Sequence, residues 1–190
     1  MGTDTLDRSL IDSEFESFVS RSKSYITTRD EDELKSLREE ITLLGENLEA
    51  ALRDCKNNHN ANYKTAVKLM LSIIDKFSDS VTLMENLKSV KPLLEEFDTK
   101  RMLDVILPNI KCLTEYDSWS INLDTKKLEE DCIYIEMLED QHKRILLTYL
   151  IQDWKNMDEV INLLKIGELY KNIAEKLVSL SLLQGYIEDN

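Results

Sequence analysis

Glycine and proline are scarce in this chain, which has 4 glycines and 2 prolines in 190 residues. Soluble proteins average about 7% Gly and about 5% Pro. Strand-rich and α/β domains need both residues at many turns, so the scarcity argues against these two classes. It favours long helices joined by few loops. It also argues against a glycine-rich phosphate loop, and no G-x-G-x-x-G or G-x-x-x-x-G-K-[ST] motif occurs.

Basic residues are also few, with 24 Lys and Arg against 37 Asp and Glu, a net charge of −13 and a pI of about 4.7. Binding to nucleic acid or to an anionic membrane needs clustered Lys and Arg, so we expect neither partner. No apolar run approaches the ~18 residues of a membrane span, and the first residues lack the apolar core of a signal peptide.

Cysteine is limited to three residues, Cys55, Cys112 and Cys132. The odd number, without a signal peptide, indicates reduced thiols. We therefore expect an intracellular protein of the nucleus or cytoplasm.

Two heptad patterns predict a long helical hairpin from Asp30 to about Lys91. In each pattern, apolar residues recur at alternating steps of three and four. The first consists of Leu34, Leu37, Ile41, Leu44, Leu48, Ala51 and Cys55, and the second of Val67, Met70, Ile74, Phe77, Val81 and Met84. The asparagine-rich residues 56–62 between them indicate a turn. Two alternatives stay open: the seams bind helices of another protein, or they face each other as core.

The C-terminal half shows the same helical character. Residues 116–124 indicate a loop whose last residue, Asp124, caps the next helix. We expect one long helix over 128–157. Asn156 and Glu159 resemble a capping box and predict a further helix start. A third seam follows, at Leu163, Ile166, Tyr170, Ile173, Leu177 and Leu180.

Two short motifs contain residue types that ligate metals. Glu139 and His142 form an E-x-x-H, which di-iron bundles use in two copies; the only other histidine, His59, has no such partner. We therefore expect His142 to be a partly buried helix residue. Cys55 and His59 form a C-x-x-x-H, but a zinc site needs further ligands, and the seam position of Cys55 favours core packing. We expect no cofactor, no metal and no catalytic residues.

Acidic residues concentrate in 115–140, which has nine acids against two lysines, a net of −7. Such a run is either a docking face for a basic partner or a solvated helix face, and we favour the second. Trp119 lies in the loop within this segment. An exposed Trp there would anchor an interface, although a core position is an equal alternative.

Residues 83–180 resemble the helical domain of the GINS replication-complex subunits. The resembling pieces, in order, are Met84–Lys88, Pro92–Leu94, Met102–Leu113, Glu136, Ile145–Leu150, Lys155–Asp158 and Leu169–Asn172. Ile151, Gln152 and Asp153 stand where that family has basic residues, and the 190 residues do not include its β domain. The resemblance implies a non-catalytic structural subunit of a replicative helicase assembly in the nucleus.

Together, these patterns predict an all-α fold: an antiparallel helical bundle with a long heptad-patterned hairpin. Residues 1–91 would form an N-terminal helix plus the hairpin, packed as one unit with a C-terminal bundle over 92–190. The expected function is that of a non-catalytic interaction subunit of an intracellular complex. A pathogen-encoded decoy that binds host helices in a groove and an all-α enzyme are the alternatives. The candidate partner-binding residues are Leu34, Leu37, Ile41, Leu44, Leu48, Val67, Met70, Ile74, Phe77, Val81, Met84 and Trp119.

Overall fold

The computed structural model describes residues 31–54, 61–87, 101–102, 104–105, 124–152 and 154–188. These residues are almost entirely helical, with no strand among them, which confirms the all-α prediction. The long helices are α2 (Glu31–Asp54), α3 (Ala61–Glu85), α6 (Thr125–Gln152) and α7 (Met157–Glu188), and a short 3-10 turn, η2 (Trp154–Asn156), separates the last two.

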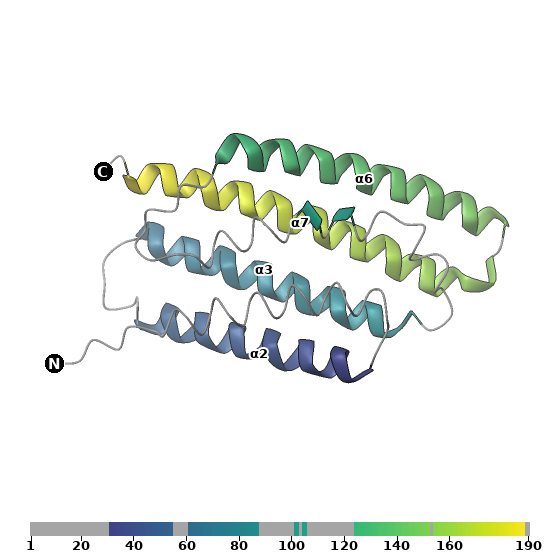
Figure 1. Ribbon diagram of the computed structural model, residues 1–190, viewed down its shortest axis with the longest axis horizontal. Helices are drawn as coiled ribbons and strands as arrows, with labels where there is room; N and C mark the ends of the chain where they lie inside the picture. The colour runs from purple at the N-terminus through teal and green to yellow at the C-terminus, as the bar shows by residue number, and fades with distance from the viewer. Residues whose placement is uncertain are drawn as a thin grey trace.

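The four long helices lie side by side in the order α2, α3, α7, α6, each antiparallel to its neighbour (Figure 1). The predicted hairpin is the α2–α3 pair, and the ion pair between Arg38 and Glu85 joins its two helices. The main helix contacts are α2 with α3, α3 with α7, and α7 with α6. Helices α2 and α6 therefore form the two edges, and each turns one side away from the other described helices.

The centre of the core lies between α3 and α7. Phe77 of α3 and Tyr170 of α7 are both fully buried, and their ring centroids are 6.3 Å apart at a tilt of 50°. This separation is within the range that aromatic pairs prefer. The third seam is buried throughout, at Leu163, Ile166, Tyr170, Ile173, Leu177 and Leu180. Met102 is buried in the same apolar cluster. A helix that is apolar on most sides must be buried by neighbouring elements. Helix α7 packs against both α3 and α6.

The turn from α6 to α7 departs from the prediction of one helix over 128–157. Helix α6 begins as expected, because Asp124 Oδ1 accepts a hydrogen bond of 3.1 Å from the amide of Lys127. It ends at Gln152, and the chain reverses through η2. The Asn156 amide donates to the Tyr149 hydroxyl at 3.0 Å and ties η2 to the last turns of α6. The reversal lets α7 begin at Met157, next to the predicted capping box.

None of the described helices combines the length and the apolar character that a membrane crossing requires.

Candidate interaction surface

The outer face of α6 carries large apolar side chains that are exposed. Toward α7, this helix buries Leu128, Ile135, Leu138, Glu139, His142 and Leu146. On the opposite side, Ile133, Met137, Leu147 and Ile151 are 59%, 64%, 53% and 87% exposed. Scattered apolar residues are normal on a protein surface. Here these four lie on one face of one helix.

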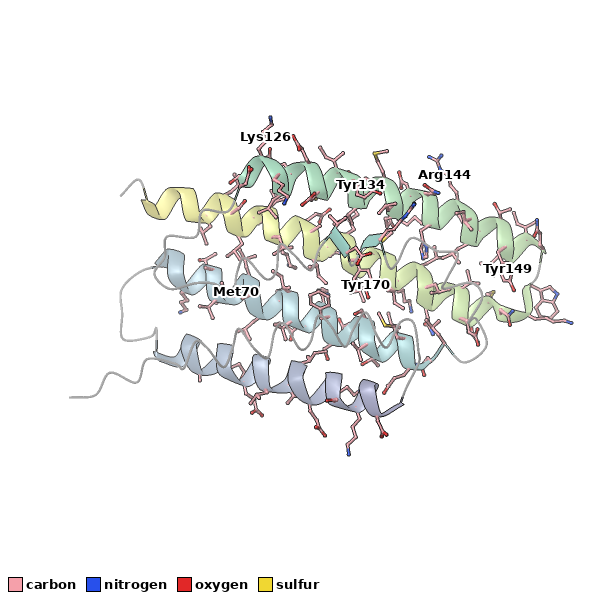
Figure 2. The ribbon with its side chains drawn as sticks, in the orientation of Figure 1. Met70, Lys126, Tyr134, Arg144, Tyr149 and Tyr170 are labelled. Carbon is pink, nitrogen blue, oxygen red and sulfur yellow. The ribbon has the colours of Figure 1, made fainter. Side chains whose placement is uncertain are left out.

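These four residues belong to a regular pattern that we call the outer stripe. It consists of Ile133, Met137, Asp140, Arg144, Leu147 and Ile151, spaced by steps of 4, 3, 4, 3 and 4. Ile133 and Ile151 each lie nine residues from His142, which is about two and a half helical turns and therefore the opposite side of the helix. Figure 2 shows Arg144 pointing away from α7 at this edge of the layer. Helix α6 thus has an apolar seam on each of two opposite faces.

Two more large apolar side chains are exposed just after α6. Trp154 is 75% exposed and Met157 is also exposed. Trp and Met are both enriched in protein–protein interfaces relative to the rest of the surface. The turn therefore adds two exposed apolar side chains that directly follow the outer stripe in the sequence.

On its inner face, α6 buries a polar cluster. Glu139 and His142 are each only 1% exposed. Lys143 Nζ forms an ion pair with Glu139 Oε1 at 2.5 Å. His142 Nε2 lies 3.3 Å from the carbonyl oxygen of Leu163 on α7. Within this cluster the His142 contact joins α6 to α7, whereas the Lys143–Glu139 ion pair lies within α6.

The cluster corrects two expectations from the sequence. His142 is fully rather than partly buried, and Glu139 does not lie on a solvated acidic face. Glu139 is buried because it continues the inner seam, in which Leu128, Cys132, Ile135, Glu139, His142 and Leu146 recur at steps of 4, 3, 4, 3 and 4. Among the described residues, no group of three or more His, Cys, Asp or Glu side chains is placed to hold a metal ion.

A second ion pair, on the surface, joins α6 to α7. Lys171 Nζ donates to Glu136 Oε1 at 2.7 Å. This hydrogen bond, together with the charge of the partner, lowers the pKa of Glu136 and raises the pKa of Lys171. Nearby, burial raises the pKa of the Cys132 thiol, a free cysteine that packs partly buried against the core.

The structure places seven of the candidate partner-binding residues in or against the monomer core. Ile41, Val67, Ile74, Phe77, Val81 and Met84 are buried, and Met70 is partly buried against the core cluster. For these residues the seam is internal, which is the second of the two alternatives that the heptad pattern left open. The side chains of Leu34, Leu37, Leu44 and Leu48, and the whole of Trp119, lie outside the described residues.

Comparisons of the chain with protein-family models, with curated proteins and with solved structures gave no match.

Proposed function

We propose that the protein is a non-catalytic helical subunit that binds another protein chain through the outer stripe of α6. The observation that carries this proposal is the alignment of Ile133, Met137, Leu147 and Ile151 on the exposed side of an edge helix. Exposed apolar patches mark interaction sites, and these residues form two such pairs on one face, one at each end of the stripe. A heptad-spaced stripe is the pattern that a partner helix covers by knobs-into-holes packing.

The position of α6 in the fold supports this choice over the hairpin seams. The inner seam of α6 already packs against α7, so the outer stripe contributes nothing to that contact. Burying these side chains against another chain would gain about 25 cal/mol for each Å² of apolar surface removed from water. The stripe is therefore better explained by binding than by folding.

The kind of assembly follows from the sequence. An intracellular multiprotein complex is consistent with the acidic composition of the chain and with its odd number of cysteines. The resemblance to GINS subunits includes α6, and a replicative helicase assembly in the nucleus stays our prediction for this complex. A decoy that captures host helices would need an apolar groove, whereas the outer stripe is the convex face of one helix, so the stripe favours the subunit.

The proposal is tested by affinity purification of the tagged full-length chain from its native cells, followed by mass spectrometry. We expect the double variant Ile133→Asp/Ile151→Asp to lose the chains that the unmodified protein recovers, with an unchanged circular dichroism melting curve. Leu43→Asp is the matched control, since Leu43 is an exposed apolar residue of α2, at the opposite edge of the layer. Equal recovery by all three proteins would overturn the proposal.

A further inference from the structure

Resting on the proposed function, we infer that the outer stripe binds a second copy of this chain, with the two α6 helices antiparallel and the two-fold axis outside the stripe at the level of residue 142. The order of residue types along the stripe carries this inference. Ile133 and Ile151 lie nine residues on either side of position 142, and Met137 and Leu147 lie five on either side. Asp140 and Arg144 lie two on either side. Read from either end, the stripe therefore places apolar side chains at the same distances from its centre. The two residues at its centre carry opposite charges.

An antiparallel pair turns this order into matched layers. In such a pair, a residue at a given distance before the axis meets the residue at the same distance after it in the second copy. Ile133 then meets Ile151 of the second copy, and Met137 meets Leu147. In heptad terms, each layer joins an a position to a d position. The two-fold symmetry repeats each pairing, so the dimer would have four apolar layers, each with one side chain from either copy. A symmetric dimer requires a surface that is complementary to itself in this way.

The charged centre of the stripe sets the direction of the pairing. Asp140 would meet Arg144 of the second copy, and the symmetry makes a second such pair. In a parallel pair, Asp140 would face its own copy, and so would Arg144, and like charges in contact are destabilising. Polar residues inside a heptad seam specify register and orientation in this way.

Both charges are available for this contact. Asp140 and Arg144 are exposed, and within the described part of the chain no ion pair engages either side chain. Figure 2 shows Arg144 on the side of α6 that faces away from α7. A second molecule would reach the outer stripe without displacing any described helix, because α6 packs chiefly against α7.

The length of the stripe indicates the strength of the dimer. From Ile133 to Ile151 the helix rises about 27 Å. One helix face of this length is smaller than the standard stable interface of about 800 Å² per partner. We therefore expect a reversible dimer whose population changes across the micromolar range.

The experiment is sedimentation equilibrium of the purified full-length chain over the micromolar range, alone and in mixtures of variants. The unmodified chain should dimerise. Asp140→Arg and Arg144→Asp should each weaken the homodimer at least about tenfold, because each single change places like charges opposite each other twice. An equimolar mixture of the two single variants should form a heterodimer, since every facing pair is then of opposite charge. The double variant Asp140→Arg/Arg144→Asp should regain the homodimer for the same reason.

Asp75→Arg is the matched control, since it makes the same change at an exposed position of α3. A chain that stays monomeric at the highest concentration would overturn the inference. A dimer that all the charge variants form equally well would overturn it too. A third outcome is a purified chain that is monomeric while Ile133→Asp/Ile151→Asp still abolishes recovery of partner chains in the affinity purification. That result would overturn the dimer and leave the proposed function standing.

Discussion

Gly167 of α7 faces His142 of α6 so closely that a β-carbon at position 167 would lie 3.3 Å from His142 Cδ2. It would also lie 3.7 Å from Glu139 Cγ. The absence of a side chain at this position lets α7 approach the buried polar cluster of α6. The closeness of the two helices here allows His142 Nε2 to reach the carbonyl oxygen of Leu163.

Larger residues at position 167 should therefore separate the two helices. We expect Gly167→Leu to lower the free energy of unfolding by about 1–3 kcal/mol, the usual cost of overpacking a core. Gly167→Ala should be close to neutral, because its gain in helix propensity of about 1 kcal/mol is offset by the contact with His142. Urea denaturation followed by circular dichroism measures both changes.

Gly45 provides the control for helix propensity. Nothing lies within 4 Å of a β-carbon built at this position of α2. Gly45→Ala should therefore stabilise the protein by up to about 1 kcal/mol. If Gly167→Ala stabilises the protein as much as Gly45→Ala does, α7 does not lie as close to His142 as the structure places it.

Lys143 should matter more to stability than an ordinary surface lysine, because its ion-pair partner is buried. Removing the ammonium with Lys143→Met leaves the carboxylate of Glu139 uncompensated, at a cost of about 1–3 kcal/mol. Thermal or urea unfolding at neutral pH measures this loss. Lys165→Met, at an exposed position of the adjoining helix α7, is the matched control and should change stability by less than about 0.5 kcal/mol.

A double-mutant cycle separates the ion pair from other effects of the substitution. Combining Lys143→Met with Glu139→Leu removes both charges, and a buried ion pair replaced by apolar residues is often neutral or stabilising. We therefore expect the double variant to recover most of the stability that Lys143→Met loses. Additive losses in the double variant would show that the two side chains do not interact.

The heptad spacing predicted much of this fold because one physical rule governs it. The seam from Val67 to Met84 and the seam from Leu163 to Leu180 are core in the structure, and residues three and four apart share a helix face. The spacing does not say what covers that face. The seam that contains Phe77 could pack inside the monomer or against a partner. The outcome depends on how the helices are arranged in space, and a local sequence pattern does not contain that information.

The two features of α6 that the sequence analysis missed both involve charged residues at seam positions. Glu139 continues the inner seam, but its charge suggests solvent until Lys143 and the neighbouring helix are placed around it. The outer stripe is interrupted at its centre by Asp140 and Arg144, so its apolar residues look scattered along the sequence. Counting heptad positions by spacing, without regard to charge, would have revealed both.

The buried hydroxyl of Tyr170 makes stability depend on pH in the alkaline range. Burial raises the pKa of Tyr170, and Ser80 offsets this only in part. The Tyr170 hydroxyl has no hydrogen-bond partner of good geometry among the described residues, and Ser80 donates its own proton to the carbonyl oxygen of Phe77 at 2.7 Å. In the unfolded chain this phenol ionises near its ordinary pKa of about 10. The contribution of Tyr170 to the free energy of unfolding is therefore fully present below about pH 10. It is lost as the pH rises above this value, because the unfolded chain then loses the phenol proton more readily than the folded protein does.

Tyr170→Phe isolates this effect from the lysines, which titrate in the same range. We expect the variant to lose less stability than the unmodified protein between about pH 9 and pH 11. At neutral pH it should be as stable as the unmodified protein or slightly more so, since an unsatisfied buried hydroxyl is removed. Urea unfolding across this pH range measures both. Parallel stability curves for the two proteins would contradict the burial of Tyr170.

The hydrogen bond between Asn156 and Tyr149 should hold the reversal from α6 to α7. Asn156→Ala removes the side-chain amide that donates to the Tyr149 hydroxyl at 3.0 Å, and we expect a loss of about 1 kcal/mol in the free energy of unfolding. Tyr149→Phe removes the acceptor from the same bond and should cost a similar amount. The two changes together should cost no more than either alone, because one bond is broken in each case. Gln152→Ala, at an exposed position near the same turn, is the control and should be neutral. Fully additive losses from Asn156→Ala and Tyr149→Phe, measured by urea unfolding, would mean that the turn is held in another way.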